Sequence, residues 1–483
     1  MNFWQKILLV IVLFFYIYFR ITPIIHQTVP YTYDQGRDFL KVKEIVENKN
    51  FTLIGPTTGL EGIFHGVWIY YFLSIPYILF SGNPIGFYYF FFLINLIVNL
   101  LFFNFLRKKF NFNLAILFLL TTSISKYFIN EAFSPSNDHL VSIFILGFIY
   151  FSYLYFLKKE KKYLFLTMMF SGFILESEFA FGLFLIPSTF FSFLIIEKKS
   201  FIKKIPLFFI SIIPPSLPRF IFEIKHNFLQ TKNFLKYLFS NQSNNLEFTQ
   251  IIKERLILFF NYINDIFTYK YLSIIFLLLF IFGLITKKIK LNKNNLWIKF
   301  NLLILSLIFL LLIIYKKDPF YPYYLNGIQY IFLIIALFFL NQKNSFLKLF
   351  NIFLIIFFLI INLINFKNSI FKKNIPLLGL RADNEIINYF VKNESKDYFC
   401  LRIYTPPVIP YTYQYLLQYY VDKKQIKYPK GDFYKGQCYF IIDKEPYEFR
   451  LSKWREENTP ENAKLIKKIS FENGSTIELW KEN

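Results

Sequence analysis

The sequence YTYDQGRDF, Tyr31–Phe39, places Asp34, Arg37 and Asp38 soon after the first long apolar run of the chain, Ile7–Phe19. Charged side chains beside an apolar segment of this length are costly unless they have partners or a function. The polar stretch is therefore the first candidate for a functional site, and the apolar runs around it decide the fold.

Composition identifies the class of protein. The chain has 483 residues, 55% of them hydrophobic and 22% aromatic, and its mean hydropathy is +0.40. Soluble domains do not carry many apolar runs of near membrane-spanning length. Such runs are Ile7–Phe19, Ile85–Phe105, Leu140–Leu157, Tyr271–Ile285, Leu302–Ile314 and Ile352–Ile364. The sequence therefore predicts a polytopic α-helical membrane protein.

The distribution of charge predicts its orientation. The formal net charge of +23 comes largely from Lys and Arg in short loops between apolar runs, which is typical of cytoplasmic loops rather than of nucleic-acid binding. No small-residue cleavage site follows the first run, so we expect an uncleaved span with a cytoplasmic N-terminus. The predicted spans, about eleven, are 6–22, 84–106, 113–130, 139–157, 163–176, 179–196, 205–222, 270–286, 297–315, 324–340 and 345–366. The Pro-containing segment Val67–Phe80 is read as interfacial or re-entrant.

This topology divides the chain at residue 366. Residues 1–366 form a membrane domain with a first outer loop at 23–83 and a second at 223–270, in which Phe248–Phe267 has the pattern of a surface helix. Residues 367–483 regain charge and are predicted to form a small extracytoplasmic α/β domain. Its expected strands are Tyr398–Tyr404, Cys438–Ile442 and Thr476–Trp480, and its expected helices are Glu385–Val391 and Tyr411–Tyr420.

The only cysteines, Cys400 and Cys438, both lie on strands predicted for the outer domain. Outside the cytoplasm they could form a disulfide. Two buried free thiols are an equal alternative, because pairing depends on a distance that sequence does not give.

Several motifs, in order along the chain, resemble GT-C fold glycosyltransferases of the bacterial branch near protein O-mannosyltransferases and lipid A aminoarabinose transferase. The first outer loop carries DQGRD, then GP, then HGVWIYY, in which Val67 replaces the family's usual proline. Weaker matches are AFSPSND at 132–138, PRFIFEIKHNFLQTK at Pro218–Lys232 and YPYYLNGIQYIFLIIALFF at 321–339. The resemblance covers most of residues 1–366.

The resemblance implies a function. The enzyme would transfer a hexose or pentose from a polyprenyl-phosphate donor to an acceptor hydroxyl at the outer face of the cell membrane. The configuration of the sugar would be inverted, and the partners would be the lipid-linked donor and the membrane lipid around it. The family's base falls on Asp34, and Arg37 would lower its pKa or meet the phosphate. From the residues alone, Asp34 could equally be the N-cap of a helix over Gln35–Glu47, with Asp38 near its first turns.

Other residues could take part in binding. The basic candidates for the donor phosphate, each also explained as a contact to lipid headgroups, are His65, Arg219, Lys225, His226, Lys316 and Lys317. The resemblance places Asp138 where relatives carry a second polar or acidic residue, sometimes linked to a metal, which would be a divalent ion. From the residues alone, Asp138 is favoured as a residue of a helix N-terminus. Glu176 and Glu178 stand where relatives carry Q-x-H, and could bind a metal or a sugar, or be solvated.

The alternatives are a polysaccharide polymerase or ligase, and a transporter. The first would depend on basic residues rather than on an aspartate base, and the second would place ionisable residues within the spans and show paired halves. The sequence has no Gly-rich phosphate loop, dinucleotide fingerprint or Ser-His-Asp pattern, which disfavours a nucleotide-sugar donor. The acceptor stays open.

Overall fold

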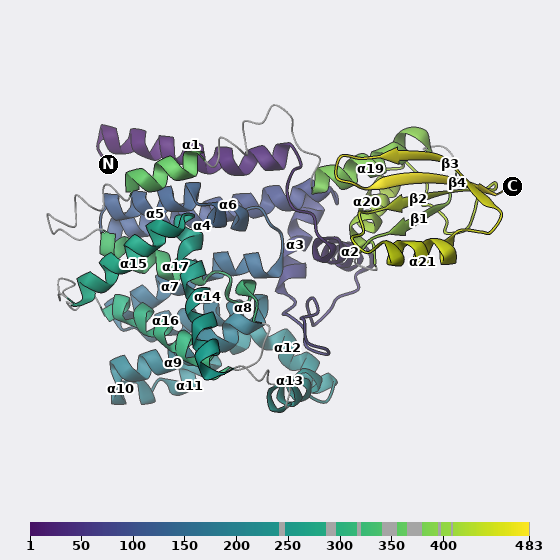
Figure 1. Ribbon diagram of the computed structural model, residues 1–483. Coiled ribbons are helices and arrows are strands. Elements are labelled where there is room, and N and C mark those ends of the chain that lie inside the picture. The colour runs from purple at the N-terminus through teal and green to yellow at the C-terminus, as the bar shows by residue number, and fades with distance from the viewer. Residues whose placement is uncertain are drawn as a thin grey trace. The chain divides into compact units, whose positions relative to one another are not determined.

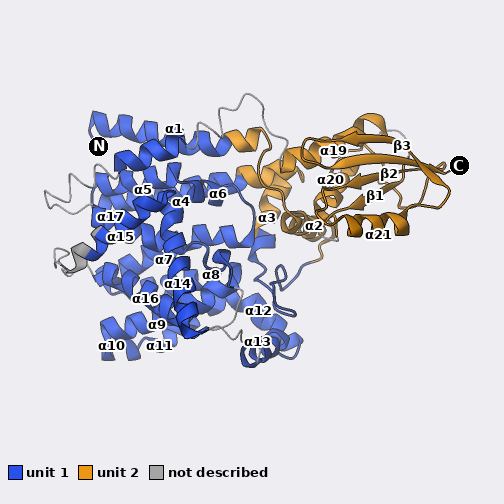
Figure 2. Ribbon diagram, viewed as in Figure 1, with its two compact units in different colours: residues 1–21, 51–71, 90–372 blue, residues 22–50, 72–89, 373–483 orange. Residues whose placement is uncertain are grey.

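The computed structural model describes residues 1–240, 247–285, 296–315, 320–340, 355–364, 379–394, 398–406 and 409–482. The chain packs into two compact units (Figure 2). The first, here called the helical unit, comprises 1–21, 51–71 and 90–372, and the second, the tail unit, comprises 22–50, 72–89 and 373–483. The predicted tail thus shares its unit with two segments from the N-terminal part of the chain.

Helices build most of the described part of the helical unit (Figure 1). They are α1 (Phe3–Ile25), α4 (Pro84–Lys109), α5 (Phe112–Ile124), α6 (Lys126–Glu131), α7 (Asn137–Lys158), α8 (Lys161–Ser177), α9 (Phe179–Glu197), α10 (Lys199–Ile202), α11 (Ile205–Ile210), α12 (Ile213–Lys225), α13 (Leu229–Phe239), α14 (Phe248–Phe267), α15 (Lys270–Ile285), α16 (Leu296–Ile314) and α17 (Ile328–Leu340), with a 3₁₀ turn at Pro322–Leu325. The last residues of α1, from 22 on, and the first residues of α4, up to 89, belong to the tail unit.

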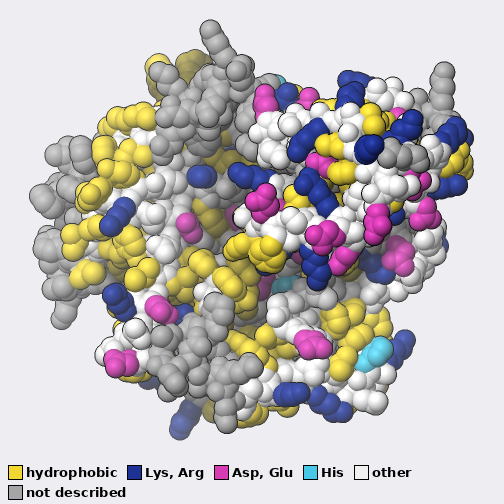
Figure 3. All heavy atoms as spheres, turned by 45° about the vertical axis from the view of Figure 1, so that its right-hand side comes forward, with side chains coloured by type: hydrophobic (Ala, Val, Ile, Leu, Met, Phe, Trp, Pro, Cys, Tyr) yellow, Lys and Arg dark blue, Asp and Glu magenta, His cyan; other side chains and the backbone are white. Residues whose placement is uncertain are grey.

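Five described helices, α1, α4, α7, α9 and α16, are long and apolar enough to cross a membrane. Their outer surfaces keep large apolar side chains exposed, for example Val10 and Leu101, each 65% exposed. Figure 3 shows apolar side chains on the surface of the helical unit, whereas charged side chains of both signs gather over the tail unit. Exposed apolar surface on this scale is what lipid covers, so the chain is a multi-pass membrane protein.

Some predicted spans differ from the structure. The spans 113–130 and 205–222 are not single helices: the first breaks at Ser125, whose backbone is extended, and the second divides into α11 and α12. Proline at the first turn of α12 explains the second break, because proline lacks the N–H that a continuous helix would need. The span 345–366 is described only as a helix at Ile355–Ile364, and Lys316 and Lys317 lie outside the described residues. The count of eleven stays a prediction.

A buried arginine holds the break between α5 and α6. Arg20 is fully buried and donates to the carbonyl oxygens of Thr122 and Phe128, at 2.5 and 3.0 Å. Its guanidinium also lies 3.7 Å from the ring centroid of Tyr16. Carbonyl groups at a helix end have no partner within the helix, and in lipid they cannot turn to water. Arg20 therefore supplies the donors that the broken backbone needs.

The tail unit contains a four-stranded sheet in the order β1-β2-β4-β3. Its strands are β1 (Leu401–Tyr404), β2 (Gln437–Ile442), β3 (Ala463–Ser470) and β4 (Thr476–Glu482), and only the β1–β2 pair is parallel. The helices are α2 (Tyr33–Asn48), α3 (Trp68–Leu79), α19 (Leu380–Asn393), α20 (Tyr411–Asp422) and α21 (Glu448–Asn458). The predicted strands and helices of the tail are found, but β3 and α21 were not predicted, because neither buries an apolar face.

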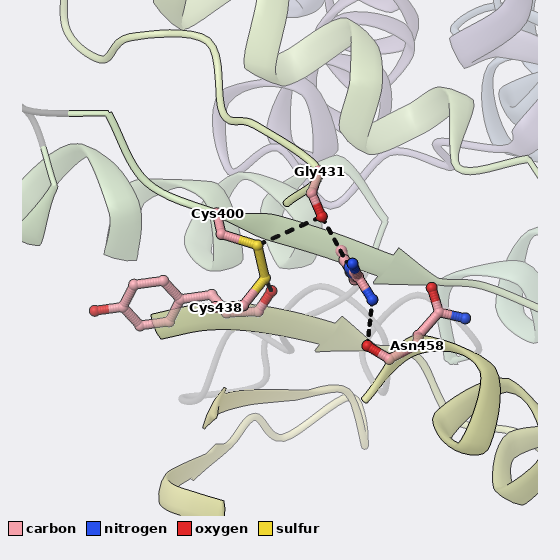
Figure 4. Close-up of a disulfide and its surroundings, with 6 residues drawn as sticks. Cys400, Gly431, Cys438 and Asn458 are labelled. Carbon is pink, nitrogen blue, oxygen red and sulfur yellow. Dashed lines mark hydrogen bonds between the residues drawn. A yellow bond between two sulfur atoms is a disulfide. The ribbon is translucent and has the colours of Figure 1, made fainter. Parts of the chain in front are cut away.

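Cys400 and Cys438 form a disulfide, which settles the alternative that the sequence left open. Cys400 precedes β1 and Cys438 lies in β2, so the disulfide links the two parallel strands covalently (Figure 4). The buried side chains of Phe440 and Ile442 complete this cluster, against which Trp454 and Trp480 pack. A covalent link across 38 residues restricts the unfolded chain and stabilises the small domain.

Helix α2 packs closely against α20 within the tail unit. A Cβ at Gly36 would collide with the backbone of Thr412, so glycine at this position permits the approach. Beside it, the Phe39 ring stacks on Phe87 with 3.9 Å between centroids, and the Tyr31 hydroxyl donates to the Thr412 carbonyl at 3.1 Å. The stretch Tyr31–Phe39 is thus held in place by the folded tail.

A carboxyl pair predicts how the tail unit responds to pH. Burial, together with the nearby Asp443, raises the pKa of Asp383 to about 8, and burial also raises the pKa of Asp443. The folded state therefore holds a proton on Asp383 that the unfolded chain releases near pH 4. The contribution of the Asp383 proton to the stability of the tail unit should be fully present below about pH 4 and should fall as the pH rises towards 8.

We expect Asp383→Asn to remove much of this dependence and to stabilise the unit by roughly 1–3 kcal/mol at pH 8. The measurement is thermal unfolding of the detergent-purified protein between pH 5 and 8.5, followed by tryptophan fluorescence, since Trp454 and Trp480 report on the tail core. Equal slopes of melting temperature against pH for both proteins would contradict the assignment.

Candidate active site

The DQGRD segment forms the first turns of α2. Thr32 is the N-cap: its hydroxyl accepts a hydrogen bond from the Gln35 N–H, and Gln35 Oε1 accepts one from the Thr32 N–H at 2.9 Å. The alternative that Asp34 caps this helix is therefore wrong. Asp34 lies in the first turn, where the helix dipole stabilises a negative charge.

Arg37 joins the carboxylates on either side of it. Its Nη1 lies 2.8 Å from Asp34 Oδ1 and its Nε lies 2.9 Å from Asp38 Oδ1. The Asp38 side chain is only 1% exposed, whereas that of Asp34 is 64% exposed. Asp38 therefore fixes the guanidinium from the protein side, and Asp34 presents a charged, accessible oxygen beside a cation.

A second group of polar side chains, the Arg219 cluster, lies in the helical unit. Arg219 Nε donates to both carboxylate oxygens of Glu176, at 3.0 and 3.1 Å, and its Nη1 donates to the Phe64 carbonyl at 2.9 Å and to Gln230 Oε1 at 3.0 Å. The Gly66 N–H donates to the Glu176 carbonyl at 2.6 Å. The cluster ties the loop before α3 to α8, α12 and α13.

This arrangement bears on several predicted binding residues. Arg219 neutralises Glu176, which is 2% exposed, so the pairing favours a positioning role over phosphate binding. The backbone of His65 pairs with the GP motif, donating to the Pro56 carbonyl at 2.8 Å. Lys225 and His226 are exposed at the end of α12, where the His226 ring stacks on Phe222 at 4.2 Å.

A third group, the Glu131 cluster, surrounds the start of α7. His139 lies between two carboxylates, with Nδ1 3.0 Å from Asp138 Oδ1 and Nε2 3.3 Å from Glu131 Oε1. Asn326 donates to Glu131 Oε1 at 2.8 Å and accepts from the Tyr127 hydroxyl at 2.6 Å. The cluster draws on α6, α7 and the turn before α17, so it forms only in the folded unit.

The carboxylates considered as metal ligands are otherwise engaged. Asp138 sits in the first turn of α7 and accepts from the Ser136 hydroxyl at 2.7 Å, as expected for a helix N-terminal residue. Glu176 and Glu178 are 2% and 4% exposed, so the alternative that they are solvated is wrong. Among the described residues, no group of three or more His, Cys, Asp or Glu side chains could hold a metal ion.

Sequence reasoning missed Glu131, His139, Asn326 and Gln230. His139 directly follows the AFSPSND motif, and Glu131 directly precedes it, so the motif itself was the available signal. Gln230 and Asn326 lie within the matches at 218–232 and 321–339, but their contacts span 166 and 195 residues, so the motifs do not reveal their partners.

Comparison with known proteins agrees with this architecture. Residues 65–216 match the family of dolichyl-phosphate-mannose-protein mannosyltransferases. No curated protein matches the chain. The crystal structure of ArnT from Cupriavidus metallidurans bound to undecaprenyl phosphate superposes with a TM-score of 0.61 at 10% identity, covering 99% of this chain and 98% of that one. Its apo structure gives 0.60 at 10% identity, with coverage of 99% and 97%.

The likeness to ArnT extends over nearly the whole of both chains, and the family match falls on the part of the sequence that holds the HGVWIYY and AFSPSND motifs. The chain is therefore a membrane protein with the GT-C fold, the fold seen in ArnT.

Proposed function

We propose that the protein transfers a sugar from a polyprenyl-phosphate donor to an acceptor hydroxyl at the outer face of the membrane, with Asp34 as general base. The observation that carries the proposal is the exposed Asp34 carboxylate, paired with Arg37 on a chain whose fold is that of ArnT. A polyprenyl phosphate appears both in the description of the matching ArnT structure, as undecaprenyl phosphate, and in the name of the matching family, as dolichyl phosphate.

The chemistry follows from these groups. Asp34 takes the proton of the acceptor hydroxyl while the oxygen of that hydroxyl attacks the anomeric carbon of the sugar. The bond from the anomeric carbon to the phosphate oxygen breaks at the same time. The phosphate leaves on its polyprenyl chain with the electron pair. Attack from the side opposite the leaving group inverts the configuration of the sugar.

Arg37 has a defined part in this reaction. Before transfer its Nη1 holds Asp34 Oδ1 at 2.8 Å, and its guanidinium can offer donors to an anionic oxygen of the donor phosphate. Asp38, buried on the other side, keeps the guanidinium in one orientation. Exposed Lys225 and His226 are further candidates for the headgroup.

The test uses the purified full-length protein in detergent, a membrane extract as the source of acceptor, and a radiolabelled sugar on undecaprenyl phosphate. We expect label to move into the extract with release of undecaprenyl phosphate. The same sugar on UDP is the control and should not be used. Transfer from UDP but not from the lipid donor would overturn the proposal.

A further inference from the structure

A hollow of about 600 Å³ lies within the tail unit, away from the Asp34–Arg37–Asp38 group. Its volume falls in the range of about 300–1,000 Å³ that small-molecule sites occupy. Its wall comes from the chain after α1, one face of α19 and the end of β3. The residues that line it are Ile25, His26, Gln27, Arg381, Asn384, Glu385, Asn388, Tyr389, Lys392, Asn393, Ile469 and Phe471.

Backbone hydrogen bonds fix this wall. The N–H of Arg381 donates to the Gln27 carbonyl at 2.8 Å, and the N–H of Leu380 donates to the Val29 carbonyl at 3.1 Å. Asn384 Nδ2 adds a bond to Gln27 Oε1 at 2.7 Å. Gly379, with φ of +56°, makes the turn that brings the start of α19 against this segment.

Helix α19 then presents a polar stripe to the hollow. Arg381, Asn384, Asn388 and Lys392 recur at the three- and four-residue spacing that places side chains on one helical face. A polar stripe on a surface helix usually needs only water. Here it faces a hollow whose other side is apolar, formed by Ile469 and Phe471.

The lining has the chemistry that a sugar requires. Amide side chains both donate and accept hydrogen bonds, as sugar hydroxyls do, and each NH₂ group carries two donor hydrogens. Asn384 and Asn393 each use one of these hydrogens within the protein, on Gln27 Oε1 and on the Tyr389 carbonyl, so each has a second one, and Asn388 adds a third amide to the lining. Tyr389 and Phe471 offer aromatic surface for the C–H faces of a sugar ring. The charged and amide side chains along α19 disfavour a lipid tail, and the single carboxylate, Glu385, disfavours a cation.

We propose that this hollow binds a hydroxyl-rich saccharide, and that the saccharide is part of the acceptor. The assignment of the ligand to the acceptor rests on the proposed function; the binding of a saccharide does not. A site held on the tail would raise the local concentration of the acceptor near the enzyme without entering the chemical step.

The experiment measures saccharide binding to the full-length protein in detergent, first on a printed array of microbial oligosaccharides and then by titration of the strongest hit. Asn388→Leu removes an amide at similar volume, and Lys392→Met removes an exposed cation at the edge of the hollow. Each should weaken binding about tenfold or less, as expected for one or two lost hydrogen bonds. Lys453→Met, exposed on α21 outside the hollow, is the matched control and should bind as the wild type does.

Release of undecaprenyl phosphate from the lipid donor by water should be unchanged in all three variants, since none belongs to the catalytic group. An array without hits, or equal affinity of the Asn388→Leu and Lys392→Met variants and the wild type, would overturn the proposal. Saccharide binding in a protein that transfers no sugar would keep the site and refute only its link to the acceptor. If Asn388→Leu does not fold, Lys392→Met alone decides.

Discussion

Replacement of Asp34 by Asn should lower the rate of sugar transfer by about 10²- to 10⁴-fold, which is the usual contribution of a general base. Asparagine keeps the shape of the side chain and can still accept a hydrogen bond from Arg37, but it cannot take the proton of an attacking hydroxyl. Arg37 keeps its contact to Asp38 at 2.9 Å, so the first turns of α2 should be undisturbed. The measurement is the initial rate of undecaprenyl phosphate release in the presence of acceptor.

Glu44→Gln is the matched control. Glu44 lies on the same helix, is 37% exposed, and pairs with Lys41 at 2.8 Å with the three-residue spacing of the Asp34–Arg37 pair. The variant loses an equivalent surface charge and an equivalent ion pair, which are each worth little. It should retain nearly full activity. Comparable activity of Asp34→Asn and Glu44→Gln would remove Asp34 from the mechanism.

The sequence can predict that Asp34 lies near the start of a helix, because the residues that decide this are its neighbours in the chain. The capping residues Thr32 and Gln35 and the partner Arg37 all lie within three residues of Asp34, and the apolar pattern of the following turns predicts α2. What the sequence could not give is the close approach to α20 at Gly36, which brings residues from the two ends of the chain together. From the sequence alone, Gly36 is explained equally well as part of the DQGRD motif and as a small residue required by close packing.

The binding residues show the opposite case. Arg219 is one of the basic candidates that the sequence offers for the donor phosphate, and it follows Pro214, Pro215 and Pro218. Its partner Glu176 is 43 residues away, and the pair was invisible to any reading of local pattern. Similarly, Glu131 and His139 converge with Asn326 only through the packing of α6, α7 and the turn before α17. The pairing of these charged residues is a tertiary property, so the sequence pattern alone does not predict it.

The pairing of Arg219 leads to the second large prediction. Arg219→Met should reduce stability by about 3–5 kcal/mol, because it leaves the buried Glu176 carboxylate without its cation. The Phe64 carbonyl and Gln230 Oε1 lose a donor as well, so the loop that carries His65 is held less firmly, by the bonds of the Gly66 N–H to the Glu176 carbonyl and of the Phe64 N–H to Gln230 Oε1. Thermal unfolding in detergent and the yield of folded protein measure the effect. Lys225→Met, an exposed cation on the same helix, should leave both unchanged.

A double variant separates positioning from phosphate binding. Glu176→Gln together with Arg219→Met removes the uncompensated charge, so it should recover most of the stability that the single variant loses. If Arg219 instead bound the donor phosphate, the single and double variants would share the same rise in KM for undecaprenyl-phosphate sugar, and stability would be near that of the wild type. Recovery of stability, with KM for the donor restored alongside it, is the result expected of a residue that acts through the loop it holds.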